Sequence, residues 1–417
     1  MIKKFGYEYV TYEELYEAYL DCRKRKRTTF NALEFEVNEN TNLYKLWYEL
    51  NSMTYEVGKS IVFCVEKPVK REVFVADFRD RIVHHLLINR INDILENEFI
   101  EDSYSCRVGK GTDYGIRKCN EYLIKATDNW TKEAWIVKCD LKSFFMTIDK
   151  KRLYDKLCRF IRSNYKADDR DLEFMCHLTK LIVFNEPQRN CIMKQSWEHW
   201  DNLPKEKSLF FCPAGQGIPI GNLTSQIFAN FYLSEFDHFV KETLGIEYYG
   251  RYVDDFFTIA PTKEEAMAAI EKCRAKLLSI GVKLHPKKFY VQPAFNGVKF
   301  IGAVIKKDRI YISNRTKGNF YAAIKHYADV LKEMRNCGVR PTMDDAEHII
   351  GSINSYIGFL VHYATYNIRK KILGDKELMK DILRLCWIDK DYKKVTMYSN
   401  LRNIISTMVW EPDKLAA

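Results

Sequence analysis

The sequence predicts an α+β fold, in which short strand-forming segments alternate with long helical ones. Residues 61–76 alternate hydrophobic and polar side chains, as two strands joined around Lys67 and Pro68 would. Residues 77–99 carry apolar side chains at helical spacing. Residues 248–261, YYGRYVDDFFTIAP, place two adjacent acids between runs of aromatic and β-branched residues. That pattern predicts a strand hairpin with the acids at its turn.

Composition limits the possible functions of the chain. Its 417 residues, 47% of them hydrophobic, exclude wholesale disorder, and a net charge of +10 favours a polyanionic partner. Twelve scattered cysteines without a C-x-x-C pair argue against a zinc site or a disulfide framework and favour reduced thiols in a cytoplasm. No signal segment or run of 18 apolar residues occurs, so we expect no membrane association. Residues 414–417 resemble a vector-encoded scar.

The N-terminal region, residues 1–133, is expected to begin with helices and to carry several groups of basic side chains. Five successive basic residues either contact a phosphate backbone or form a solvated helix face or loop: Arg23, Lys24, Arg25, Lys26 and Arg27. Three more lie near the tip of the predicted hairpin, where they suit a triphosphate or a plain charged turn: Lys67, Lys70 and Arg71. A glycine-bearing loop at 103–112 adds Arg107 and Lys110 but lacks the spacing of a P-loop.

Two stretches in the middle of the chain resemble parts of a functional site. Residues 135–137 predict a strand that brings Asp140 to its carboxyl end, a position typical of site residues. Residues 214–232 contain three glycines that allow the backbone to approach a ligand, followed by a helix that Thr224 or Ser225 is expected to cap. Between them, residues 151–210 predict helices and a polar loop with little functional signal.

The C-terminal half continues with a helix at 262–280, which begins at a predicted capping box of Thr262 and Glu265. Lys287 and Lys288 follow, and then a strand pair. From Asn314 onward we expect helices and a basic tail.

Asp140, Asp254 and Asp255 are the candidate centre of the chemistry. Two adjacent carboxylates in so apolar a setting need compensation for their like charge, and a divalent cation with oxygen ligands supplies it. Phosphoryl transfer by two divalent ions needs carboxylates from adjacent strands, which the predicted strand end and hairpin would provide.

In their order along the chain, these motifs resemble those of reverse transcriptases. Asp140-Leu-Lys-Ser-Phe-Phe145 resembles the first palm motif, and Tyr252-Val-Asp-Asp255 the signature Y-x-D-D. Leu284-His-Pro-Lys-Lys288 and Phe300-Ile-Gly302 resemble the two motifs that follow. The resemblance implies a right-hand polymerase with fingers, a palm of antiparallel sheet backed by helices, and a helical thumb. We expect the palm at 134–305 with a fingers insertion at about 151–212, the thumb at 306–375, and a helical extension at 376–413.

The subtype is similar to the reverse transcriptases of diversity-generating retroelements. Ile220-Gly221 stands where other relatives carry Gln-Gly, Ser225-Gln226 replaces the Ser-Pro of intron enzymes, and residues 353–358 resemble the thumb of the retroelement enzymes. That subtype implies error-prone cDNA synthesis opposite template adenines, a structured template RNA, a small basic accessory protein and a bacterial or phage origin. Three alternatives remain: a reverse transcriptase of antiviral defence, a non-catalytic nucleic-acid-binding scaffold, and an RNA-templated RNA polymerase.

The resemblance also implies roles for residues at matching positions. Asp140, Asp254, Asp255 and the carbonyl of Leu141 would bind two Mg²⁺ ions, for which Mn²⁺ can substitute. Lys288 would protonate the departing pyrophosphate, and Phe145 would exclude a 2′-hydroxyl. The residues expected to contact the nucleotide are Lys67, Lys70, Arg71, Arg107, Phe145, Ile220 and Gly221. The residues expected to contact template RNA, primer or cDNA are the basic residues at 23–27 and Tyr252.

Overall fold

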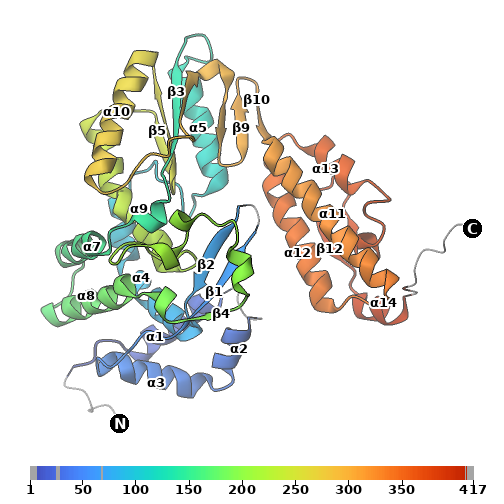
Figure 1. Ribbon diagram of the computed structural model, residues 1–417, viewed down its shortest axis with the longest axis horizontal. Helices are drawn as coiled ribbons and strands as arrows, with labels where there is room; N and C mark the ends of the chain where they lie inside the picture. The colour runs from blue at the N-terminus through green and yellow to red at the C-terminus, as the bar shows by residue number, and fades with distance from the viewer. Residues whose placement is uncertain (1–6, 25–28, 67–68, 409, 411–417) are drawn as a thin grey trace, which may run out of the picture. The chain divides into compact units, whose positions relative to one another are not determined.

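The computed structural model describes residues 7–24, 29–66, 69–408 and 410, and these divide into two compact units (Figure 1). Unit 1 combines Met1–Gly111 with Val137–Val291, and unit 2 combines Thr112–Ile136 with Gln292–Ala417. The mixture of helices and antiparallel strands confirms the predicted α+β class. Residues 25–27, Lys67 and the suspected scar at 414–417 lie outside the described residues.

Unit 1 begins with helices, namely α1 (Tyr12–Arg23), α2 (Phe30–Glu36), α3 (Glu39–Asn51) and α4 (Phe78–Glu98). Of these, α1 and α4 have side-chain N-caps. Asp77 begins α4 by accepting the Arg79 N–H at 3.0 Å, and the helix buries Leu86, Leu87 and Ile91. The helix predicted at 77–99 is therefore confirmed, and α1 packs against it.

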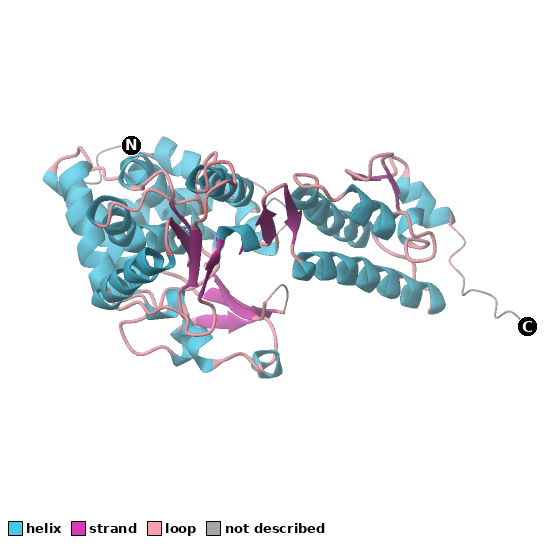
Figure 2. Cartoon of the chain, turned by 90° about the horizontal axis from the view of Figure 1, so that it is seen from above, coloured by secondary structure: helices cyan, strands magenta, loops and turns pink. Residues whose placement is uncertain are grey.

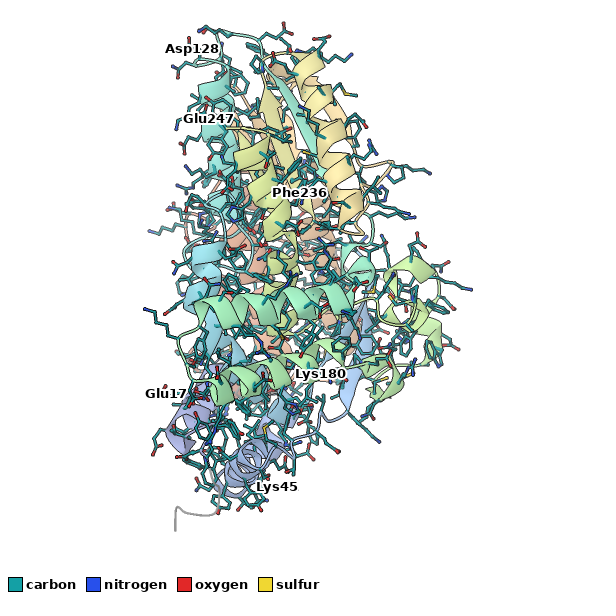
Figure 3. The ribbon with its side chains drawn as sticks, turned by 90° about the vertical axis from the view of Figure 1, so that its left-hand side faces the viewer. Glu17, Lys45, Asp128, Lys180, Phe236 and Glu247 are labelled. Carbon is teal, nitrogen blue, oxygen red and sulfur yellow. The ribbon has the colours of Figure 1, made fainter. Side chains whose placement is uncertain are left out.

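A three-stranded sheet of order β2-β1-β4 extends from this helical layer. The antiparallel hairpin of β1 (Ser60–Val65) and β2 (Arg71–Val75) agrees with the alternation of residues 61–76. The parallel partner β4 (Cys191–Met193) had no signal in the sequence. It follows α7 (Lys150–Asn164) and α8 (Asp169–Phe184), which lie side by side in Figure 3, and short 3₁₀ turns lead on from it to residue 211.

The central sheet, most of whose residues belong to unit 1, has the order β5-β6-β3-β7. Its strands are β5 (Tyr249–Tyr252), β6 (Asp255–Ala260), β3 (Trp135–Asp140) and β7 (Tyr290–Pro293). Two helices pack near it, α9 (Leu223–His238) and α10 (Lys263–Ser279). Phe236 of α9, labelled in Figure 3, packs edge-on against Tyr249 and Phe256 at 6.3 and 5.3 Å between ring centroids. These aromatic contacts pack the sheet against α9.

Unit 2 joins an antiparallel sheet to helices. It contains α5 (Thr112–Ala126), then β8 (Val298–Phe300), β9 (Ala303–Lys306) and β10 (Arg309–Ile312), and then α11 (Asn314–Asn336), α12 (Met343–Leu360) and α13 (Tyr366–Leu373). The helices expected for the thumb are therefore present. No described helix is long and apolar enough to cross a membrane.

The C-terminal extension at 376–413 is not wholly helical, which corrects the prediction. It contains an antiparallel pair, β11 (Cys386–Ile388) and β12 (Val395–Met397), before a short α14 (Leu401–Thr407), as Figure 2 shows. Asn354 of α12 both donates to the Val395 carbonyl at 2.7 Å and accepts its N–H at 2.8 Å. This contact between residues far apart in the sequence holds a strand where the chain had been expected to be helical.

Candidate active site

The three aspartates converge at one end of the central sheet. Asp140 is the last residue of β3, and the β5–β6 hairpin pairs Tyr252 with Asp255 so that Asp254 lies in its turn. The Leu141 N–H donates to the Asp254 carbonyl at 2.9 Å, which ties the end of β3 to that turn. The His285 N–H donates to the Asp140 carbonyl at 2.7 Å from the other side. Backbone bonds therefore bring together carboxylates that are 114 residues apart.

Burial and the repulsion of neighbouring carboxylates raise the pKa of Asp254 and of Asp255. Burial, followed by the nearby charges of Asp140 and Asp255, raises the pKa of Asp254 to about 7. Burial also raises the pKa of Asp255, and the neighbouring Lys138 opposes that rise. A cation placed among the three carboxylates would relieve the repulsion, because it favours their charged forms.

Two lysines pair with the carboxylates of Asp140 and Asp255. Lys288 Nζ lies 2.8 Å from Asp140 Oδ2, and Lys138 Nζ lies 2.9 Å from Asp255 Oδ1. Lys288 was predicted to belong to the site, whereas sequence reasoning missed Lys138. The available signal was its position two residues before Asp140 on the same strand, because alternate side chains share one face of a strand.

The donor chemistry of the cluster suits a hard divalent ion. Carboxylate and carbonyl oxygens are the ligands that Mg²⁺ and Mn²⁺ prefer. Among the described residues, no three histidine, cysteine, aspartate or glutamate side chains are already arranged around one point as a ligand set. Lys288 bonds Asp140 Oδ2 and Lys138 bonds Asp255 Oδ1, so a bound cation would share or compete for these two carboxylates with the lysines.

Phe145 and Ile220 contact the same hydrophobic cluster, and their roles toward a nucleotide stay predictions. Both are partly buried and pack against a cluster formed by Val62, Cys64, Phe74, Met146, Trp200 and Leu209. The Ile218 N–H donates to the Phe145 carbonyl at 3.0 Å, and the Phe74 N–H donates to the Ile220 carbonyl at 2.8 Å. The loop that carries Ile220 is thus bonded both to the short helix α6 (Phe144–Thr147), which follows Asp140, and to β2.

Gly221 serves a close approach within the protein. Its φ is +129°, and a Cβ there would lie 2.6 Å from the Phe74 carbonyl oxygen. The expectation that Thr224 or Ser225 caps α9 is wrong, because both are buried inside the helix. Asn222 occupies the N-cap position, and its side chain accepts the Ala76 N–H at 3.0 Å instead.

Arg107 has a structural environment that does not match its predicted contact with a triphosphate. Its side chain is 6% exposed, and Nε lies 2.8 Å from a carboxylate oxygen of Glu96. Nη1 donates to the carbonyls of Ile100 and Ser103 at 2.6 and 3.0 Å. A guanidinium bound in this way fastens the loop after α4, so we remove Arg107 from the candidate nucleotide contacts.

The remaining basic candidates are more accessible. Arg71 is exposed at the start of β2, and Lys70 pairs with Glu66 at 2.9 Å. Arg23 pairs with Glu36 at 2.5 Å, and Lys24 pairs with Asp21 at 2.6 Å. Tyr252 is half-buried beside the aspartates. Contacts of these residues with nucleotide or nucleic acid remain predictions.

The family of the chain follows from sequence comparison. The family model described as "Reverse transcriptase (RNA-dependent DNA polymerase)" matches residues 67–305, more than half of the chain. The chain belongs to the reverse transcriptase family. This membership confirms the expected polymerase fold.

Individual relatives are distant. Protein YkfC of Escherichia coli strain K12 is 25% identical over 265 residues, which cover 56% of this chain and 62% of that protein. The chain therefore spans about three fifths of the length of this curated relative. Among solved structures, a telomerase from Candida tropicalis is 13% identical with a TM-score of 0.47, covering 78% of this chain and 58% of that one. A telomerase from Candida albicans in complex with a TWJ fragment of telomeric RNA is 11% identical with a TM-score of 0.43, covering 79% and 58%.

Proposed function

We propose that this reverse transcriptase family member is an RNA-directed DNA polymerase. The observation that carries the proposal is the convergence of Asp140, Asp254 and Asp255 at one end of the palm sheet. The strongly raised pKa of Asp254 supports it, because perturbed carboxylates cluster where an enzyme binds a cation or moves a proton.

The three aspartates, together with the Leu141 carbonyl, would hold two Mg²⁺ or Mn²⁺ ions. When bound, such ions activate the attacking hydroxyl and neutralise the leaving group in phosphoryl transfer. The protein itself holds the carboxylates in register through the bond between Leu141 and Asp254. Lys288, whose Nζ lies 2.8 Å from Asp140 Oδ2, would donate a proton to the departing pyrophosphate.

Substrate choice would depend on the loop and turn beside the aspartates. Phe145 would lie beneath the sugar of the incoming deoxynucleotide and exclude a 2′-hydroxyl. Arg71 and Lys70 would attract its triphosphate from β2 and the hairpin before it. Template RNA and the growing cDNA would follow the basic surface of a protein with net charge +10.

At the level of subtype, we propose error-prone synthesis of the diversity-generating kind, from a structured template RNA in a bacterial cytoplasm with a small basic accessory protein. The support is Ile220, an apolar, half-buried side chain at the position where other relatives carry glutamine. An isoleucine fills the space but has no polar atom with which to hold a nucleotide in one pose.

Primer extension on an RNA template with deoxynucleotides and Mg²⁺ tests the activity. We expect Asp254→Asn to abolish extension, because it removes a carboxylate that the ions need, and to leave folding and RNA binding intact. The matched control is Asp149→Asn, at the N-cap of α7, where asparagine caps equally well. Extension by Asp254→Asn within about tenfold of wild type would contradict the assignment.

A further inference from the structure

The turn between the two strands that carry the aspartates has a strained backbone. Val253 adopts a φ of +55°, in the left-handed region. A β-branched residue rarely occupies that region, because its Cβ crowds the neighbouring carbonyl. Such a conformation persists where surrounding contacts impose it. Val253 immediately precedes Asp254, so whatever holds this residue also sets the direction in which Asp254 leaves the turn.

Two buried side chains hold Val253 from both sides. Its N–H donates to Ser105 Oγ at 3.2 Å, and its carbonyl accepts from Arg251 Nη1 at 2.9 Å. Ser105 comes from the loop after α4, which is remote in sequence from the hairpin. Both backbone polar groups of the strained residue are therefore bonded to side chains that flank the turn.

The two holding side chains are themselves fixed. Arg251 is fully buried, and its Nε and Nη2 lie 2.8 and 2.5 Å from the two carboxylate oxygens of Asp237 on α9. Asn230, also on α9, accepts from Arg251 Nη1 at 3.1 Å and donates to the Ser105 carbonyl at 2.7 Å. A bidentate ion pair leaves the guanidinium little freedom, so its remaining nitrogen points at Val253 in one geometry.

We propose that Ser105 and Arg251 are positioning residues that clamp Val253 and thereby fix Asp254 and Asp255 for catalysis. The inference rests on the proposed polymerase function. Hydrogen bonding between β5 and β6 already specifies the register Tyr252↔Asp255. Strand pairing does not determine the backbone conformation of the two turn residues, Val253 and Asp254. The clamp fixes that conformation. Shifts of about 1 Å in a catalytic group cost as much as 100-fold in rate.

A double-mutant cycle tests the clamp. Ser105→Ala removes the acceptor of the Val253 N–H, and Val253→Gly lets the turn adopt a positive φ without help. We expect Ser105→Ala to lower kcat about 10- to 100-fold in the Val253 protein. In the Val253→Gly background we expect it to lower kcat by no more than about twofold. Equal losses in the two backgrounds would overturn the proposal.

A matched control separates this coupling from general destabilisation. Ser234 is a buried hydroxyl of α9 whose hydrogen bonds go to Glu98, Lys156 and Phe231 rather than to the β5–β6 turn. Ser234→Ala is expected to change kcat by the same factor in the Val253 and the Val253→Gly proteins.

Hydrogen exchange gives a reading that does not depend on activity. We expect Ser105→Ala to raise amide exchange in the peptide covering residues 252–256 and to leave the exchange of residues 257–260, in β6, unchanged. Unchanged exchange at 252–256 would overturn the clamp whatever the activity. An inactive wild-type protein whose variant shows the raised local exchange would instead reject the polymerase function and uphold the clamp.

Arg251→Lys tests the second bond. A lysine keeps the positive charge opposite Asp237 but lacks the fork that reaches the Val253 carbonyl. We expect a lower kcat, a KM for the deoxynucleotide within about twofold of wild type, and faster exchange at 252–256. A wild-type kcat in a folded Arg251→Lys protein would remove Arg251 from the clamp. If this variant does not fold, the Ser105 cycle decides.

Discussion

At the scale of single residues, the site is organised by charge compensation. Asp140 and Asp255 each have a lysine partner within 3 Å, while burial and two like charges raise the pKa of Asp254 to about 7. Asp254 is consequently the carboxylate whose ionisation depends most on what enters the cluster. We therefore expect the pH dependence of the enzyme's Mg²⁺ requirement to follow the ionisation of Asp254.

The Mg²⁺ requirement of extension should therefore rise as pH falls from 8 to 6. Protons compete with the ion for Asp254, because the metal-free carboxylate is protonated below a pKa of about 7. The same raised pKa makes the metal-free protein less stable as pH rises from 3.8 to about 7, with no further loss above that, since the folded state disfavours the charged form of Asp254. Mg²⁺ titrations of extension rate at several pH values measure the first effect, and a half-saturating Mg²⁺ concentration independent of pH would contradict it.

Ile220 should govern fidelity. A glutamine there could order the nucleotide through one hydrogen bond, worth roughly 0.5–1.5 kcal/mol, which corresponds to up to about tenfold in discrimination. We expect Ile220→Gln to lower misincorporation, most visibly opposite template adenine, with less effect on correct insertion. Ile220→Val, which stays apolar, is the control and should keep the wild-type error spectrum. Single-nucleotide incorporation opposite each template base measures both, and identical spectra for wild type and Ile220→Gln would exclude Ile220 from fidelity.

At the scale of elements, the loop before α9 joins the segment that follows Asp140 to the hairpin of β1 and β2. Its backbone bonds reach Phe145 on one side and Phe74 on the other, and Gly221 allows the second approach. The glycine had been expected to admit a ligand, but the atom that its missing side chain admits is the Phe74 carbonyl oxygen.

Gly221→Ala should accordingly destabilise the protein more than Gly215→Ala. Both glycines have positive φ, so both substitutions incur backbone strain of about 1 kcal/mol or more. Only at Gly221 would the added methyl also collide with backbone, 2.6 Å from the Phe74 oxygen, whereas nothing lies within 4 Å at Gly215. Denaturant unfolding of the two variants measures the difference, and equal losses would show that the contact with β2 yields easily.

At the scale of the whole molecule, composition and fold favour a nucleic-acid partner. A net charge of +10 draws phosphates to the surface, and counterion release makes that attraction depend on salt. We expect the affinity for RNA to fall about 10³- to 10⁵-fold between 50 and 200 mM salt if six to ten phosphates are contacted. Filter binding across a salt series measures the slope. Asp254→Asn should give the same slope as wild type, and an affinity insensitive to salt would contradict phosphate binding.

The sequence by itself determined the local elements and the identity of the catalytic cluster. Alternation and helical spacing predicted the hairpin of residues 61–76, the helix that the structure shows as α4, and the turn that carries Asp254. These features are encoded by neighbours a few positions apart, where periodicity and turn chemistry act. The resemblance of the motifs then identified the family.

Only the tertiary structure decided which distant residues meet. Three contacts join parts of the chain that share no local sequence pattern. They are the ion pair of Lys138 with Asp255, the ion pair of buried Arg107 with Glu96, and the hydrogen bond from the Val253 N–H to Ser105. The β11–β12 pair likewise depends on Asn354 of α12. Such contacts form because folding must satisfy every buried polar group, and partners for those groups are chosen by proximity in space.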